Sequence, residues 1–136
     1  MNQQTATPIR SFSVLLSPTP RGARLVRLLA TEQLRAWGLP LDPTALIVAE
    51  LANNAATHGR VSGRNFQLLL YVVGATLRIE VTDTRGDSLP HTQLPAADAE
   101  SGRGLVLIDA PADKWGVTSG LPPRKTVWAE YTAHGM

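Results

Sequence analysis

The stretch Leu46-Ile47-Val48-Ala49-Glu50-Leu51-Ala52-Asn53-Asn54-Ala55-Ala56-Thr57-His58-Gly59 decides the fold, because it sets strongly polar groups into the pattern of an amphipathic helix. At helical spacing its side chains form two neighbouring stripes: Leu46, Glu50, Asn54 and His58 in one, and Ile47, Leu51 and Ala55 in the other. Glu50 and Asn54 therefore border the face that should pack on the core. An unpaired polar group at such a place costs about 1–3 kcal/mol, so either the fold or a ligand must satisfy both.

Two interpretations of this helix are open. In the first, Glu50 is solvated at the helix edge and Asn54 caps a neighbouring loop. In the second, the pair belongs to a ligand site: the carboxylate accepts a proton and the amide oxygen binds a hard cation such as Mg²⁺, a combination that suits a nucleoside triphosphate. The second interpretation requires a phosphate-binding element elsewhere in the chain.

The composition favours a single globular domain. A chain of 136 residues with mean hydropathy near zero can form one modest core. The formal charge is only +2 and basic residues are scattered among acidic ones, so direct binding to nucleic acid is not expected. With no cysteine, disulfides, thiol nucleophiles and Cys-ligated zinc are excluded, and the three separated histidines give no metal-ligand spacing. No signal peptide or membrane-spanning run is apparent, so we expect no membrane attachment and a cytoplasmic protein.

The segments around the central helix predict a β-α-α-β-β-lid-α-β-β order. We expect residues 1–10 to be a flexible leader and residues 11–136 to form one domain. Periodicity and turn residues predict strands at 11–16, 65–73, 76–82, 115–118 and 125–131, and helices at 21–37, 43–58 and after Gly104. Gly74-Ala75 should close a hairpin. This order predicts an α+β two-layer sandwich, with a mixed, mostly antiparallel sheet and helices on one face.

Two further features could complete a nucleotide site. Asp83 follows the alternating apolar residues of strand 76–82 on their buried side, either as a turn-forming residue or as a site carboxylate. Residues 84–101 are long and aperiodic for a connection and predict a lid. Gly102-Arg103-Gly104-Leu105 then opens a helical run, where backbone N–H groups and the helix dipole can hold phosphate.

Taken in order, these motifs resemble a known family. They are Glu50-Leu51-Ala52-Asn53-Asn54-Ala55 with His58-Gly59, Val81-Thr82-Asp83, Gly102-Arg103-Gly104-Leu105, Ala112-Asp113-Lys114-Trp115-Gly116, and Lys125-Thr126-Val127-Trp128-Ala129-Glu130. The set resembles the small GHKL-type ATP-binding domains of bacterial anti-sigma factor/serine-threonine kinase regulators, most closely their actinobacterial branch. The resemblance covers about residues 11–131 and implies the Bergerat-type ATP-binding fold.

The resemblance also implies roles for particular residues. Glu50 corresponds to the catalytic general base and Asn54 to the Mg²⁺ ligand, while Asp83 corresponds to the acceptor of the adenine amino group. Gly102, Arg103, Gly104 and Leu105 correspond to the glycine box that lies against the phosphates. Thr126 corresponds to a position close to the adenine. The implied cofactors are ATP and Mg²⁺.

The implied function is that of a stand-alone regulator, because sensor kinases, topoisomerases and chaperones of this superfamily need a further domain. We expect an ATP-binding anti-sigma-factor-like protein that phosphorylates a serine or threonine of an antagonist protein. Its partners would be a sigma factor, that antagonist, or both, with the arginine-rich helix 21–37 as a partner or homodimer surface. The alternative is a nucleotide-dependent interaction module without kinase activity, which is favoured by Thr84-Arg85-Gly86-Asp87 in place of a regular D-x-G-x-G box.

Overall fold

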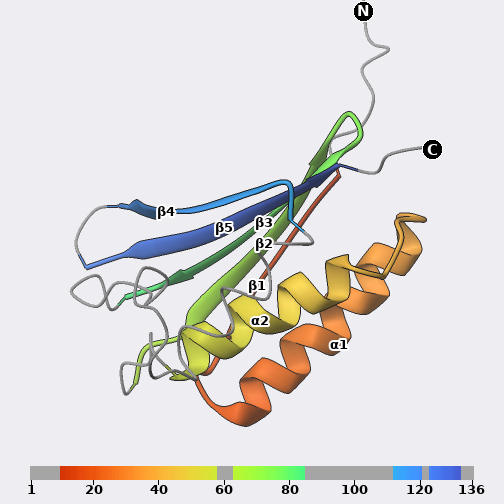
Figure 1. The fold of residues 1–136 in the computed structure, drawn as a ribbon. Helices are drawn as coiled ribbons and strands as arrows, with labels where there is room; N and C mark the ends of the chain where they lie inside the picture. The colour runs from red at the N-terminus through yellow and green to blue at the C-terminus, as the bar shows by residue number, and fades with distance from the viewer. Residues whose placement is uncertain (1–9, 58–62, 85–111, 121–122, 133–136) are drawn as a thin grey trace, which may run out of the picture.

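The computed structural model describes residues 10–57, 63–84, 112–120 and 123–132, and these form two layers (Figure 1). The elements are β1 (Arg10–Leu16), α1 (Pro20–Ala36), α2 (Thr44–Thr57), β2 (Phe66–Val73), β3 (Thr76–Asp83), β4 (Lys114–Ser119) and β5 (Lys125–Thr132). Residues 1–9 of the predicted leader, almost all of the predicted lid, and the helix expected directly after Gly104 lie outside the described residues, while Arg10, also assigned to the leader, begins β1. None of the described helices is both long enough and apolar enough to cross a membrane.

Helix α1 begins and ends within one residue of the predicted bounds because its caps are local. Thr19 is the N-cap, and its hydroxyl accepts a 3.0 Å hydrogen bond from the Gly22 N–H. Pro20 follows at the first helical position, where no N–H is needed. At the other end Gly38 has φ of 73° and donates its N–H to the Arg35 carbonyl, so glycine ends the helix as expected.

Helix α2 begins at Thr44, one residue later than the predicted start at Pro43. The Leu41 and Pro43 carbonyls accept the first N–H groups of the helix, and the Thr44 hydroxyl donates to the Pro40 carbonyl. The inward stripe predicted for this helix is confirmed, since Ile47, Leu51 and Ala55 are all buried.

The sheet has the order β1-β2-β3-β5-β4, and every described strand pair is antiparallel. The α+β sandwich is therefore confirmed, while a parallel pair is not seen among these strands. Strands β2 and β3 form the predicted hairpin, in which Gly74 has φ of 62°, a left-handed conformation that glycine adopts without strain. Strand β5 joins this hairpin through the β3–β5 ladder, so segments that are far apart in sequence become neighbours.

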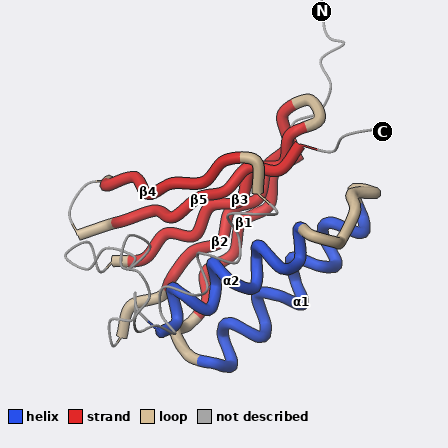
Figure 2. The backbone as a smooth tube through the Cα atoms, in the orientation of Figure 1, coloured by secondary structure: helices blue, strands red, loops and turns tan. Residues whose placement is uncertain are grey.

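The core lies between the helices and one face of the sheet (Figure 2). Alternation along β3 points Leu77, Ile79 and Val81 into it, as the period of two predicts. Its largest apolar members are Phe66, Leu34, Ile47, Leu51, Leu68, Leu70 and Ile79. No described helix covers the opposite face of the sheet, where Leu15 and Val73 are 62% and 67% exposed. We call this the open face.

Candidate functional site

Helix α2 turns Asn54 inward and Asn53 outward. Asn54 is only 5% exposed, whereas Asn53 is exposed and contributes its backbone carbonyl to a hydrogen bond from the Thr57 hydroxyl. Of the two adjacent amides, Asn54 therefore lies on the core side of the helix, as the i+4 spacing from Glu50 predicts. An inward amide oxygen next to a nucleotide is a suitable ligand for Mg²⁺, which takes oxygen ligands from few protein groups and from phosphates.

Glu50 lies one turn before Asn54 and is partly buried. Loss of hydration raises the pKa of its carboxyl above the ordinary value of 4.5, and the positive charge of Arg27 on α1 opposes part of that rise. A carboxylate with a raised pKa is a better general base than a fully solvated one, because a base is most effective when its pKa lies nearer the working pH.

The carboxylate that ends β3 is buried together with a cation. Asp83 is 3% exposed, and Lys125, directly opposite it in the β3–β5 ladder, is 2% exposed. The Lys125 Nζ lies 3.6 Å from the Asp83 Oδ2. The predicted burial of Asp83 is confirmed, and Lys125 is the residue that the sequence reasoning missed. The sequence did contain a signal for the burial of Lys125, because the period of two puts it on the same side of β5 as the buried Val127 and Ala129.

The fold brings these groups toward one end of the molecule. The C-terminal end of α2, the end of β3 and the start of β5 lie at the same end in Figure 1, and α2 packs against both strands. Asn54 belongs to that end of α2, and Asp83 and Lys125 belong to those ends of the strands. The helix layer thus contributes Glu50 and Asn54, a potential base and a potential metal ligand, and the sheet contributes the buried Asp83–Lys125 pair.

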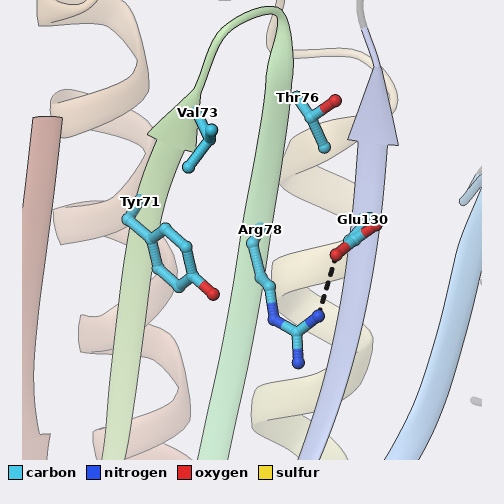
Figure 3. Close-up of a pocket in the computed structure, with 5 residues that line it drawn as sticks. All are labelled: Tyr71, Val73, Thr76, Arg78 and Glu130. Carbon is cyan, nitrogen blue, oxygen red and sulfur yellow. Dashed lines mark hydrogen bonds and ion pairs between the residues drawn. The ribbon is translucent and has the colours of Figure 1, made fainter. Parts of the chain in front are cut away.

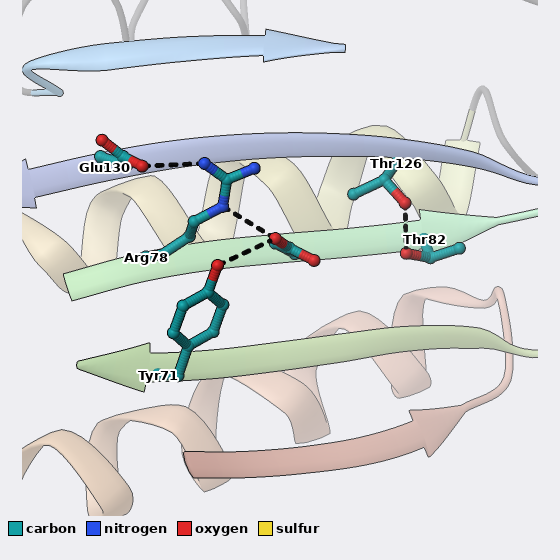
Figure 4. A network of polar contacts seen from close by, with 6 residues as sticks. Tyr71, Arg78, Thr82, Thr126 and Glu130 are labelled. Carbon is teal, nitrogen blue, oxygen red and sulfur yellow. Dashed lines mark hydrogen bonds and ion pairs between the residues drawn. The ribbon is translucent and has the colours of Figure 1, made fainter. Parts of the chain in front are cut away.

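Thr126 lies on the opposite side of the sheet from Asp83. Its hydroxyl shares a 2.7 Å hydrogen bond with the Thr82 hydroxyl on the open face (Figure 4). The side chains of Asp83 and Lys125 belong to the buried series of their strands, on the helix side. The structure therefore does not bring the Thr126 side chain together with Asp83, and its proximity to an adenine stays a prediction. Gly102, Arg103, Gly104 and Leu105 lie outside the described residues, so their contact with phosphate also stays a prediction.

Thr84 marks the point where β3 leaves the sheet. Its Oγ1 is buried and has no hydrogen-bond partner within the described ranges. A crevice of about 310 Å³ adjoins it on the open face, lined by Leu15, Asn65, Gln67, Thr82, Thr84 and Arg124. The Thr84 hydroxyl is therefore a further hydrogen-bonding group at this end of the sheet, on the face opposite the Asp83 carboxylate.

The open face also carries a charged cluster centred on Arg78. Its guanidinium makes 2.8 Å ion pairs with Glu80 and Glu130, and the pair with Glu130 is drawn in Figures 3 and 4. It also stacks on the Trp128 ring, 4.2 Å from the centroid. Burial disfavours the charged guanidinium, but the hydrogen bonds to both carboxylates outweigh that effect and hold the pKa of Arg78 above its ordinary value. The adjoining pocket of about 350 Å³ is lined by Tyr71, Val73, Thr76, Arg78 and Glu130. Because its cation is already paired with carboxylates, this pocket does not attract anionic phosphate.

The described residues offer two buried oxygen-bearing side chains at this end of the molecule. The Asn54 amide carries an oxygen of the kind that binds Mg²⁺ together with phosphates, and the Asp83 carboxylate is a hydrogen-bond acceptor. No group of three or more His, Asp or Glu side chains that could hold a metal ion occurs among the described residues.

A known protein family matches most of the chain. The sequence matches the model of a family described as the histidine kinase-like ATPase domain over residues 16–130, which is most of the chain. A search of curated proteins finds no match.

Proposed function

Because this chain belongs to the histidine kinase-like ATPase domain family, we propose that it is an ATP-binding regulator that phosphorylates a serine or threonine of an antagonist protein. The observation that carries the proposal is the arrangement on α2, where a partly buried carboxylate with a raised pKa precedes an inward amide by one turn. A domain that only held ATP would need the metal-binding amide but no base beside it.

The mechanism assigns a separate task to each layer. Asp83 would accept a hydrogen bond from the adenine amino group and so fix the nucleotide, while Asn54 would hold the metal through its amide oxygen. Mg²⁺ would supply charge neutralisation at the phosphates. Glu50 accepts the proton of the attacking hydroxyl as the new oxygen–phosphorus bond forms at the γ-phosphate. The bond between the γ-phosphorus and the β,γ-bridging oxygen breaks, and ADP leaves.

The first test is calorimetric titration with Mg·ATP. We expect saturable binding by the unmodified protein, and a loss of about tenfold or more for Asn54→Ala or Asp83→Ala, since each removes a contact to a charged or buried group. Asn53→Ala is the matched control, because it removes the same side chain one position away on the exposed side of the helix. If Asn53→Ala weakened binding as much as Asn54→Ala, the assignment of the metal ligand would be wrong.

The second test separates the kinase from the interaction module. Glu50→Gln keeps the shape of the side chain but removes its basicity, so we expect it to retain Mg·ATP and to lose phosphate transfer from γ-labelled ATP to serine- and threonine-containing peptides. Equal transfer by Glu50→Gln and by the unmodified protein would refute the role of Glu50 as base. ATP binding without any transfer by either protein would favour the nucleotide-dependent interaction module.

We further propose that α1 provides the protein-binding surface of this cytoplasmic regulator. Leu25 and Leu28 are 43% and 65% exposed on this helix, beside the exposed Arg21, Arg24 and Arg27. Apolar groups flanked by arginines suit a sigma factor, an antagonist or a second copy of the chain. If the partner is a second copy, Leu28→Asp should lower the solution mass measured by light scattering from that of a dimer to that of a monomer.

A further inference from the structure

Arg27 belongs both to the exposed surface of α1 and to the surroundings of Glu50 on α2. Its side chain is exposed beside Leu28, and α1 packs directly against α2. We propose that Arg27 is a positioning residue that links the docking of an acidic protein segment on α1 to the strength of Glu50 as a base. This inference rests on the proposed function, because it names the charge class of the partner and the way in which its docking regulates the same site.

The geometry of the helix pair brings Arg27 level with Glu50. Helices α1 and α2 run antiparallel side by side and are joined by the short connection 37–43 (Figure 1). Arg27 lies nine residues before the end of α1, and Glu50 lies six residues after the start of α2. A difference of three residues is a rise of about 4.5 Å along a helix, which is less than one turn. Each residue also borders the packed face of its helix, since Arg27 follows buried Val26 and Glu50 precedes buried Leu51.

The charges around Glu50 give this proximity an effect. Among the described residues, the charge that acts on the Glu50 carboxyl is that of Arg27, which opposes the rise in its pKa caused by burial. The charged side chains that face α2 from the sheet are Asp83 and Lys125, and these lie close together with opposite signs. The Glu50 carboxyl is therefore balanced between loss of hydration and one exposed cation.

The surface around Arg27 favours an acidic partner. The first half of α1 carries basic charge alone, on the exposed Arg21, Arg24 and Arg27. The one acidic residue of the helix, Glu32, is paired with Arg35 at 2.7 Å. Leu25 and Leu28 are 43% and 65% exposed among these arginines, so the surface suits a segment that carries both carboxylates and apolar side chains. A second copy docked through the same surface would instead bring like charges together.

Docking of such a segment should strengthen the base. A partner carboxylate that pairs with Arg27 offsets its positive charge at Glu50, and the docked chain also removes water from the helix pair. Both changes raise the pKa of the Glu50 carboxyl. Because a general base becomes more effective as its pKa approaches the working pH, the bound protein would activate the residue that receives its hydroxyl proton.

Carbon-13 NMR titration of the Glu50 carboxyl in the full chain tests this without nucleotide, and Glu50→Gln identifies the resonance by its loss. The probe is an unlabelled peptide of alternating cysteic acid and leucine, whose sulfonates stay ionised throughout the titration. The control peptide has asparagine in place of cysteic acid. We expect the charged peptide to shift the Glu50 pKa upward and the control peptide to leave it unchanged. Failure of the charged peptide to bind, or an unchanged pKa at saturation, would overturn the proposal.

Variants then assign the effect to Arg27. Arg27→Met should raise the Glu50 pKa without any peptide and abolish most of the further rise on adding the charged peptide, whereas Arg27→Lys should keep the pKa near that of the unmodified protein. Arg24→Met, one turn earlier on the same surface, is the matched control: it also removes one charge from the peptide site but should shift the Glu50 pKa less. Equal pKa values in Arg27→Met and the unmodified protein would refute the coupling.

Failure of this inference can be distinguished from failure of the proposed function. If the unmodified protein transfers phosphate and Arg27→Met leaves the Glu50 pKa unchanged, the base stands and the coupling is wrong. If the unmodified protein neither binds Mg·ATP nor transfers phosphate, the proposed function is wrong, and the regulatory meaning of the coupling is lost with it even where the titration shows the shift.

Discussion

The open-face cluster predicts that two arginines with equally short ion pairs contribute very differently to stability. Arg78 and its carboxylate partners Glu80 and Glu130 are each about a quarter exposed, at 24%, 22% and 26%. Arg35 makes an equally close pair with Glu32, at 2.7 Å, but those side chains are 58% and 74% exposed. The two arginines differ both in burial and in their number of partners, because Arg78 contacts two carboxylates and the Trp128 ring, whereas Arg35 forms an ion pair with Glu32 alone within the described residues.

The magnitude follows from the contacts of Arg78. Each partly buried, charge-assisted hydrogen bond contributes about 1 kcal/mol after allowance for solvent screening. The cation–π contact with Trp128 adds about 0.5–1 kcal/mol. Arg78→Met also leaves Glu80 and Glu130 without their shared cation, so we expect a loss of about 2–3 kcal/mol in the free energy of unfolding. For Arg35→Met we expect a loss below about 0.5 kcal/mol.

Urea denaturation at pH 7 measures the free energy of unfolding of both variants. An unchanged slope of that free energy against urea concentration would show that the unfolded state is not altered. Added salt should weaken the already small effect of Arg35→Met more, in proportion, than that of Arg78→Met, because exposed charges are screened more strongly. The reasoning would be refuted if the two variants lost the same stability within about 0.5 kcal/mol.

Two further changes test the helices. At Gly22 a Cβ would lie 1.9 Å from the Ser17 carbonyl oxygen. Gly22→Ala should therefore lower the free energy of unfolding by about 1–3 kcal/mol or more, despite the better helix propensity of alanine. Gly120→Ala is the control and should be tolerated, because a Cβ there would make only ordinary contacts. The raised pKa of Glu50 means that the folded state binds a proton more tightly than the unfolded state, so wild-type stability falls as the pH rises from below 4.5 through the folded pKa. Glu50→Gln should therefore be more stable than wild type at pH 7, and the difference should vanish below pH 4.5; a wild type that is the more stable protein at pH 7 would contradict this.

Much of the architecture could be predicted because its signals are local. The alternation Leu77, Ile79, Val81 and the caps around α1 depend on neighbours within a few residues, so strands and helix bounds follow from the sequence. The inward direction of Asn54 follows from helical spacing in the same way. Local reasoning also predicted burial of Asp83, since the residue continues the buried series of β3.

The features that escaped prediction depend on which strands become neighbours. Lys125 pairs with Asp83 only because β5 adds to β3, and a lysine is ordinarily exposed, so its place in an alternating series was not enough to predict burial. The same ladder places Arg78 opposite Glu130 and so creates the charged cluster. The register also turns the Thr126 side chain to the open face, a placement that the resemblance did not specify, and its proximity to an adenine stays a prediction.

The long-range β3–β5 ladder has a consequence for folding kinetics. The β2–β3 and β4–β5 hairpins join strands that are close in sequence, whereas Asp83 and Lys125 are more than 40 positions apart. Contacts of that separation require closure of a long loop, which costs entropy and slows their formation. The site thus lies at the junction between two locally formed hairpins and is complete only when they dock. ATP should accordingly slow unfolding without accelerating folding, which stopped-flow measurements with and without the nucleotide would detect.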